Sequence, residues 1–190
     1  IETIGEGDRI LEVSFFGGTF TAIDINKQRE LLAVAKEYKD KKIIDYIRLS
    51  TRPDYIDEFI LDHLKSYKVD IIELGVQSLD KEVLHKSGRG HDYDEFLKGL
   101  EKLKAKNIKV IVHIINGLPG EDYNMMMETA KAVANMGVDG IKIHLLHVIK
   151  DTPMEKMLQK GMLTLMNQEE YINLVCDQLE ILPETMIVHR

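Results

Sequence analysis

Several apolar segments of this chain end in glycine, hydroxyl, amide or histidine residues, and these types together suit the binding of a polar small molecule. The first such place is residues 14–21, where an apolar segment runs into Gly17, Gly18 and Thr19. Glycines carry no Cβ, so the backbone at such a pair can approach a ligand closely. Similar ends recur at residues 50–54, 77–78, 113–117 and 144–147, and the loops 88–91 and 150–153 accompany them.

The apolar pattern predicts that strands and helices alternate along the whole chain. We expect strands over residues 11–16, 43–49, 69–76, 108–115, 140–149 and 186–188. Between them we expect helices over residues 26–38, 54–66, 80–85, 93–106, 122–136, 153–160 and 168–182. This alternation is typical of an α/β protein whose parallel sheet curls into a partial (β/α)6 TIM-like barrel. The carboxyl ends of parallel strands share one edge of the sheet, so we expect the polar residues to meet at one mouth.

Composition narrows the class of protein. The 190 residues are 44% hydrophobic and 30% charged, which suits one domain over residues 1–190. No segment has the roughly 18 apolar residues of a membrane span or the pattern of a signal peptide, so we expect a cytoplasmic protein without membrane contact. The net charge of −7 favours no polyanionic partner. The single cysteine, Cys176, excludes a disulfide framework, and we expect it to be a buried core thiol.

Some candidates also have a purely structural interpretation. Gly17 and Gly18 can simply form a tight turn. Arg52 carries a fork that suits a carboxylate or phosphate, but it also stands where Pro53 and Asp54 could begin a helix. Both interpretations stay open for these residues.

Three histidines raise the question of a metal site. His113 lies inside a predicted strand, where a core histidine is commoner than a ligand. His144 and His147 are three residues apart on a predicted strand, so we expect them on opposite faces. No carboxylate pair accompanies them, and we therefore predict no protein-bound metal. A metal-dependent barrel hydrolase that uses these three histidines is one alternative function.

Taken together, the strand ends resemble those of the radical S-adenosylmethionine superfamily. Residues 16–21 are similar to its glycine motif, and residues 50–55, 73–78 and 88–91 resemble the radical domain of the Elongator catalytic subunit. Residues 113–121, 139–144 and 146–154 resemble a bacterial family of Fe–S oxidoreductases in the same Elongator-subunit and MiaB-like group. The resemblance covers nearly the whole chain.

The resemblance implies residues that bind S-adenosylmethionine, by analogy with the related oxygen-independent coproporphyrinogen oxidase. The backbone of Gly17 and Gly18, with Thr19 beside it, would meet the methionine part of the cofactor. Gln77 and Arg89 would reach its ribose and its carboxylate.

Further contacts follow from the same analogy. Ser50 and His113 stand where that enzyme has acidic residues that bind the cofactor. The backbone at Asn116 and Gly117 would lie against the adenine. The resemblance identifies no catalytic residue and no substrate.

The superfamily also holds a 4Fe–4S cluster on three cysteines that follow its first strand, and this sequence lacks them. The resemblance therefore implies a core fragment, truncated at both ends, whose first strand and cluster loop lie upstream and which is inactive alone. The intact protein would cleave S-adenosylmethionine reductively to a 5′-deoxyadenosyl radical. It would take electrons from a donor such as flavodoxin or ferredoxin, and kinship with the Elongator subunit makes tRNA a candidate substrate. A non-catalytic module that binds a cofactor or a partner is the second alternative.

Overall fold

The fold is built on one sheet of six parallel strands, whose order in the sheet follows the sequence. The computed structural model describes residues 9–90 and 92–189, so His91 in the predicted loop 88–91 lies outside the described residues. The strands are β1 (Glu12–Phe15), β2 (Tyr46–Thr51), β3 (Ile71–Gln77), β4 (Lys109–Asn116), β5 (Gly140–Leu145) and β6 (Ile187–His189). Every neighbouring pair is parallel, which confirms the predicted sheet.

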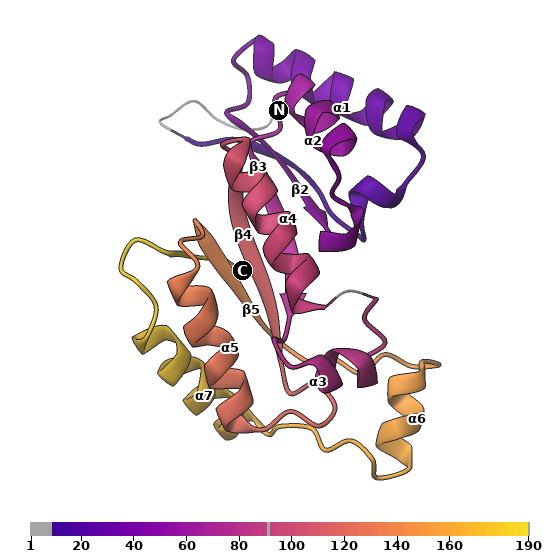
Figure 1. Ribbon diagram of the computed structural model, residues 1–190, viewed down its shortest axis with the longest axis vertical. Helices are drawn as coiled ribbons and strands as arrows, with labels where there is room; N and C mark the ends of the chain where they lie inside the picture. Colours follow the sequence, from indigo (N-terminus) through magenta and orange to yellow (C-terminus); the bar gives the residue numbers. More distant parts are fainter. Residues whose placement is uncertain (1–8, 91, 190) are drawn as a thin grey trace.

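Helices connect consecutive strands, as Figure 1 shows. The longer ones are α1 (Ile25–Asp40), α2 (Glu58–Ser66), α4 (Tyr93–Ala105), α5 (Tyr123–Asn135) and α7 (Gln168–Glu180). The short ones are α3 (Lys81–Lys86) and α6 (Pro153–Gln159), with single 3₁₀ turns at Phe20–Ala22 and Pro53–Tyr55. In Figure 1, α3 and α6 lie near each other at the lower right, beyond the strand ends that lead into them.

The sheet curls strongly, and one contact shows how strongly. Arg48 on β2 approaches His189 on β6, with Nη1 and Nδ1 3.4 Å apart. Four strand spacings separate these strands, which would be about 19 Å in a flat sheet. The six strands therefore form a half-barrel with a concave inner face, as the alternating pattern predicted.

The two faces of the sheet differ because successive side chains of a strand point to opposite sides. On the convex face, Leu49, Leu74 and Val112 are fully buried against helix residues such as Phe96 of α4 and Leu61 of α2. The concave face instead carries polar and charged side chains from the same strands. The apolar core thus lies between sheet and helices and leaves the inner face free for chemistry.

Side-chain caps explain where the helices begin. A side-chain oxygen just before the first turn accepts a hydrogen bond from a free backbone N–H in α1 to α7; the capping residues are Asp24, Asp57, Asp80, Asp92, Asp122, Thr152 and Asn167. The helix predicted over residues 54–66 is for this reason shorter: the chain makes a 3₁₀ turn at Pro53–Tyr55, and α2 starts only after Asp57.

Two other expectations are wrong. The strand predicted over residues 140–149 ends at Leu145, because its neighbour β4 ends at Asn116 and offers Leu146 only one last hydrogen bond. Cys176 is exposed, because the buried residues of α7 are Leu174 and Gln178 and Cys176 lies about half a turn away from both.

Among the residues that the structure describes, no helix is long and apolar enough to cross a membrane.

Candidate functional site

The predicted site residues meet at the carboxyl ends of β1 to β5. A cavity of about 380 Å³ opens there on the concave face, within the usual size range of small-molecule sites. Seven of the nine predicted residues line it: Gly17, Gly18, Thr19, Ser50, Gln77, Arg89 and His113. The two others, Asn116 and Gly117, lie elsewhere. The structure thus brings together residues that are up to 96 positions apart in the sequence.

Gly17 and Gly18 form an open cradle at the end of β1. Their φ angles are +106° and +153°, a region that residues with a Cβ rarely adopt. Within the described part of the chain, no atom lies within 4 Å of the place where a Cβ would stand on either residue. Backbone geometry alone therefore requires glycine here, and the space above the backbone is free for a ligand.

Gln77 is held in an unusual conformation. Its φ is +68°, and Ser78 N donates to Val76 O at 2.9 Å, so Gln77 is the central residue of a γ-turn. Gly75, two residues earlier on the same face, makes room for the side chain, because a Cβ there would collide with Gln77 Nε2. Gln77 is 6% exposed, and its Oε1 has no hydrogen-bond partner among the described residues. Such an orphaned acceptor in a cavity wall suits a ligand donor.

His113 on β4 and His144 on β5 lie edge to face, with ring centroids 4.2 Å apart. Burial, assisted by the nearby His144, lowers the pKa of His113 to about 4. His113 is therefore neutral at physiological pH. Its Nε2 is buried and lacks a partner among the described residues, so this nitrogen too is available to a ligand.

Two arginines approach the cavity, and only one of them is neutralised. Arg52 donates to its neighbour Asp54 through Nε and Nη2, at 2.9 and 2.7 Å. Arg89 is half-buried, and within the described ranges no carboxylate pairs with it. Burial and the positive charge of Arg52 lower the pKa of Arg89. An anionic group of a ligand would pair with this guanidinium.

A buried ionic cluster forms the floor of the cavity. Glu73 on β3 is 4% exposed and pairs with Arg48 of β2 and with Lys142 Nζ of β5, the latter at 2.8 Å. Ser50 Oγ donates to Glu73 Oε2 at 3.0 Å. Burial opposes ionisation of Glu73, but Lys142 and Arg48 outweigh it and hold its pKa below the ordinary value. Lys142 also lies 4.7 Å from the ring centre of Phe16.

Sequence reasoning missed this cluster, although a signal was present. Glu73 and Lys142 are charged residues within apolar strands. Glu73 lies an even number of positions from Gln77 on β3, and Lys142 lies an even number of positions from His144 on β5. A period of two therefore assigns them to the face that carries the site residues.

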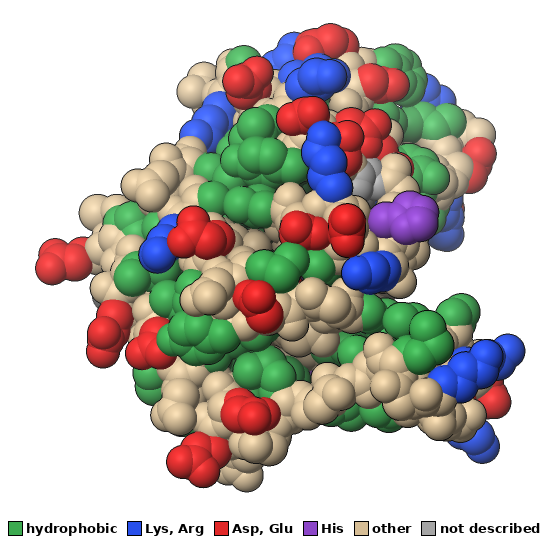
Figure 2. Space-filling model, turned by 60° about the horizontal axis from the view of Figure 1, so that its bottom comes forward, with side chains coloured by type: hydrophobic (Ala, Val, Ile, Leu, Met, Phe, Trp, Pro, Cys, Tyr) green, Lys and Arg blue, Asp and Glu red, His purple; other side chains and the backbone are tan. Residues whose placement is uncertain are grey.

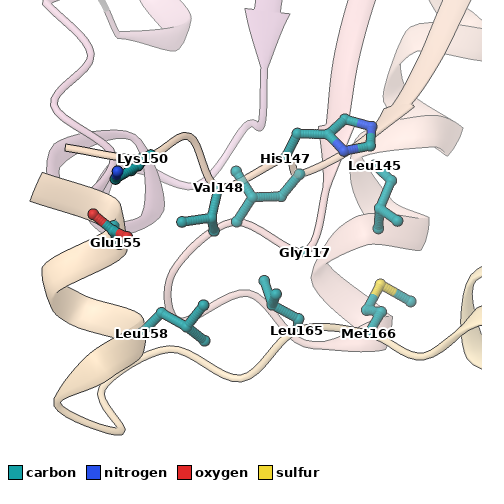
Figure 3. Close-up of a pocket in the computed structure, with 10 residues that line it drawn as sticks. Gly117, Leu145, His147, Val148, Lys150, Glu155, Leu158, Leu165 and Met166 are labelled. Carbon is teal, nitrogen blue, oxygen red and sulfur yellow. The ribbon is translucent and has the colours of Figure 1, made fainter. Parts of the chain in front are cut away.

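Asn116 and Gly117 lie beside a second cavity. The Asn116 side chain is 1% exposed and hydrogen-bonded to Gln178 of α7, so it points away from the concave face. Gly117, with φ of +83°, lines a cavity of about 580 Å³ together with Leu158 of α6 and Met166. Figure 3 shows Gly117, Val148, Leu165 and Met166 around this space. Of Asn116 and Gly117, only Gly117 lines the second cavity, so a ligand there could contact the Gly117 backbone.

His144 and His147 do not behave as expected. Because β5 ends at Leu145, His147 is no longer on the strand, and both histidines line a third cavity of about 600 Å³ between α6 and the loop after α3. This cavity shares Arg89 and His144 with the first one. Figure 2 shows the surface hollowed on the right, beside the arm where α6 lies. In the part of the chain that the structure describes, no three metal-ligating side chains group together.

Comparisons with known proteins show the family of this chain. The family model for the radical SAM superfamily matches residues 1–133, and the model for the radical SAM C-terminal domain matches residues 138–190. The uncharacterized protein YtqA of Bacillus subtilis is 48% identical over 147 residues, which are 76% of this chain and 46% of that protein.

Two further likenesses point to the Elongator group. The tRNA uridine(34) acetyltransferase of Methanocaldococcus infernus is 26% identical over 204 residues, which cover 97% of this chain and 38% of that enzyme. The solved structure of the Elp3 protein of the same archaeon, with an N-terminal deletion, superposes with a TM-score of 0.85 at 27% identity, over 94% of this chain and 47% of that one. The chain spans about half the length of the curated relatives it matches.

Proposed function

The chain belongs to the radical SAM superfamily, and from this premise we propose that the cavity at the ends of β1 to β5 binds S-adenosylmethionine for radical chemistry. The observation that carries the proposal is the set of unsatisfied groups in one cavity wall. Among the described residues, Gln77 Oε1 and His113 Nε2 have no hydrogen-bond partner and Arg89 has no paired carboxylate, while Gly17 and Gly18 leave an open cradle. These groups match the ribose hydroxyls, the carboxylate and the ammonium group of the cofactor.

Each residue has a role that its geometry allows. Arg89 would pair with the methionine carboxylate, and the carbonyl oxygens at Gly17 and Gly18 would accept from the ammonium group. Gln77 and His113 would bond the ribose hydroxyls, while the adenine would extend out of this cavity to the backbone at Gly117, which lines the second cavity. S-adenosylmethionine, when bound and reductively cleaved, supplies a 5′-deoxyadenosyl radical that abstracts hydrogen from a substrate. The chain's own contribution is to orient the cofactor and to exclude water from it.

The residues present do not fit the iron–sulfur cluster. A 4Fe–4S cluster needs several thiolates, and the 190 residues contain one cysteine, Cys176, which lies exposed on α7. We therefore propose that the cluster depends on cysteines outside these residues, and that the 190 residues alone do not perform radical chemistry.

The substrate, the partners and the location belong to the proposal as well. The likeness to a tRNA uridine acetyltransferase makes tRNA the first substrate to test. Because the net charge of these 190 residues is −7, we propose that lysines and arginines outside them contact the tRNA phosphates. Reduction of the cluster would need a donor such as flavodoxin or ferredoxin. With one cysteine and no disulfide framework, a cytoplasmic location is the natural expectation.

The proposal is tested with the full-length protein, reconstituted anaerobically with iron and sulfide. Wild-type protein should bind S-adenosylmethionine and release 5′-deoxyadenosine after reduction. Arg89→Ala should weaken binding about tenfold or more, because it removes a charge-assisted pair. The matched control is Arg29→Ala, an exposed arginine of α1, which should bind as wild type.

Three results would contradict the proposal. Cofactor binding without release of 5′-deoxyadenosine from a reduced cluster would favour a non-catalytic binding module. One zinc ion per purified chain would favour the metal-dependent hydrolase. Equal affinity of the Arg89 and Arg29 variants would place the cofactor elsewhere.

A further inference from the structure

Gln178 is a polar residue where the packing of α7 calls for an apolar one. The residues that α7 buries include Leu174 and Gln178, four positions apart, and both are 0% exposed. Positions four apart lie on one face of a helix, and that face normally carries apolar side chains. A fully buried amide here needs an explanation beyond packing.

The amide of Gln178 is bonded to two other elements. Asn116 Nδ2 donates to Gln178 Oε1 at 2.8 Å, and Gln178 Nε2 donates to Asn116 Oδ1 at 3.0 Å. The same Nε2 also donates to the carbonyl of Met126 at 3.2 Å. Gln178 thereby joins α7 to the end of β4 and to α5, and α5 and α7 lie side by side in Figure 1.

A buried pair of amides such as Asn116 and Gln178 fixes the relative orientation of its two residues more than it adds to the stability of the fold. Replacing both partners of a buried hydrogen bond by apolar groups of similar shape is often nearly neutral, whereas a reciprocal amide pair permits only one mutual orientation. Asn116 is the last residue of β4, and its own carbonyl accepts from Leu146 N at 2.9 Å. The next residue, Gly117, has a positive φ of +83°, so a change in the orientation of Asn116 would also turn the Gly117 backbone.

We propose that Gln178 is a positioning residue for cofactor binding: through Asn116 it fixes the backbone at Gly117 that flanks the adenine. This inference rests on the proposed function, which puts the adenine at that backbone. Glu121 holds the same turn from the other side, because its Oε2 accepts from Gly117 N at 3.1 Å and from Leu118 N at 3.2 Å. Gly117 and Met166, which lies over it, are both visible in Figure 3.

The test compares three variants of the full-length protein. Gln178→Met removes the amide but leaves Asn116 unpaired. The double variant Asn116→Leu with Gln178→Met removes both amides. Gln168→Met, at the exposed start of the same helix, is the matched control. The measurements are the Kd for S-adenosylmethionine, the thermal midpoint, and hydrogen exchange of the Gly117 and Leu118 amides without the cofactor.

If Gln178 is a positioning residue, the variants should differ in their affinity for the cofactor in a way that their stability does not explain. The single variant should lower the thermal midpoint by several degrees, because an unpaired amide stays buried. The double variant should regain most of that loss, yet bind the cofactor about tenfold more weakly than wild type. In it, the Gly117 and Leu118 amides should exchange faster while those in the middle of β4 stay protected. The control should match wild type in all three measurements.

The outcomes distinguish the two proposals. A double variant with wild-type affinity and wild-type exchange at Gly117 would show that the pair serves packing only, which overturns the inference. Absence of cofactor binding by the wild-type protein would overturn the proposed function instead. Hydrogen exchange at Gly117 and Leu118 would then still decide whether Gln178 fixes the turn.

Discussion

Gln77 reaches the cavity because two neighbouring residues direct its side chain there. Gly75 leaves the space into which the side chain folds, and the γ-turn closed by Ser78 gives the backbone its positive φ. Strained backbone of this kind is stable only where the surroundings hold it, and it concentrates at functional sites. The binding group and the residues that direct it can therefore be separated by mutation.

Gly75→Ala should weaken S-adenosylmethionine binding about tenfold, because the new Cβ pushes the Gln77 amide out of the cavity wall. Stability should fall by less than about 1 kcal/mol, since the Cβ meets the flexible end of a side chain and not backbone. Binding titrations and urea unfolding of the same samples measure the two effects.

Gly99→Ala is the matched control for this variant. A Cβ on Gly99 would make ordinary contacts with Pro53 at 3.7 Å, and alanine favours the helix by about 0.5–1 kcal/mol. The Gly99→Ala variant should therefore bind the cofactor as the wild type does and unfold at a slightly higher urea concentration. Unchanged affinity in Gly75→Ala would mean that Gln77 does not contact the cofactor.

At the level of elements, the turn from β4 to α5 depends on a buried carboxylate. Glu121 Oε1 accepts from Ser78 Oγ at 2.8 Å, while Oε2 accepts from two backbone N–H groups of the turn. Glu121 thus joins the turns that follow β3 and β4. Burial raises the pKa of Glu121 to about 7 from its ordinary 4.5, although the Ser78 hydroxyl opposes the shift.

This raised pKa predicts a pH-dependent stability. The folded state holds the Glu121 proton more tightly than the unfolded chain does. The contribution of protonated Glu121 to the free energy of unfolding is therefore complete below about pH 4.5 and is lost as the pH rises to about 7. The loss should amount to about 3 kcal/mol. Urea unfolding from about pH 4.5 to about pH 8 measures it as the difference between wild type and Glu121→Gln.

The glutamine variant isolates this group because it keeps an acceptor for the turn and cannot ionise. His113 titrates in the opposite sense: its pKa of about 4 means that stability rises with pH between about 4 and 6.5. That contribution is common to both proteins and cancels in the difference. A difference that stays flat over the whole range would refute the assignment to Glu121.

At the scale of the whole molecule, a cluster of charged side chains crosses the concave face. Arg48, Glu73 and Lys142 join β2, β3 and β5, and Arg48 also approaches Glu12 on β1 and His189 on β6. The cluster therefore links the first strand of the sheet to the last one across the hollow. It supports the curl of the sheet directly beneath the cavity.

Glu73→Gln should lower the free energy of unfolding by about 3–5 kcal/mol, because it leaves two buried cations without their carboxylate. Glu12→Gln is the control: Glu12 is 30% exposed and 3.4 Å from Arg48, so its loss should cost less than about 1 kcal/mol. Both values follow from urea unfolding at neutral pH. Similar losses in the two variants would mean that Glu73 is not the centre of the cluster.

The sequence pattern predicts the order and type of nearly every element, because strands and helices here have clear periods of 2 and 3.6. It does not predict the end of β5 at Leu145, which depends on where the neighbouring strand stops. It also misses Gln178 and Lys142, whose roles arise from partners 62 and 69 residues away. The roles assigned to the nine cofactor residues stay predictions until binding is measured.

The strand order has a consequence for how the protein is made. Each strand pairs only with the strands next to it in the sequence, so every new unit can dock on its predecessor as it leaves the ribosome. The contacts of Arg48 with His189 and of Asn116 with Gln178 break this order, since they span 141 and 62 residues. The sheet can thus grow early in synthesis, whereas the Gly117 turn receives its last partner only after α7 has been translated.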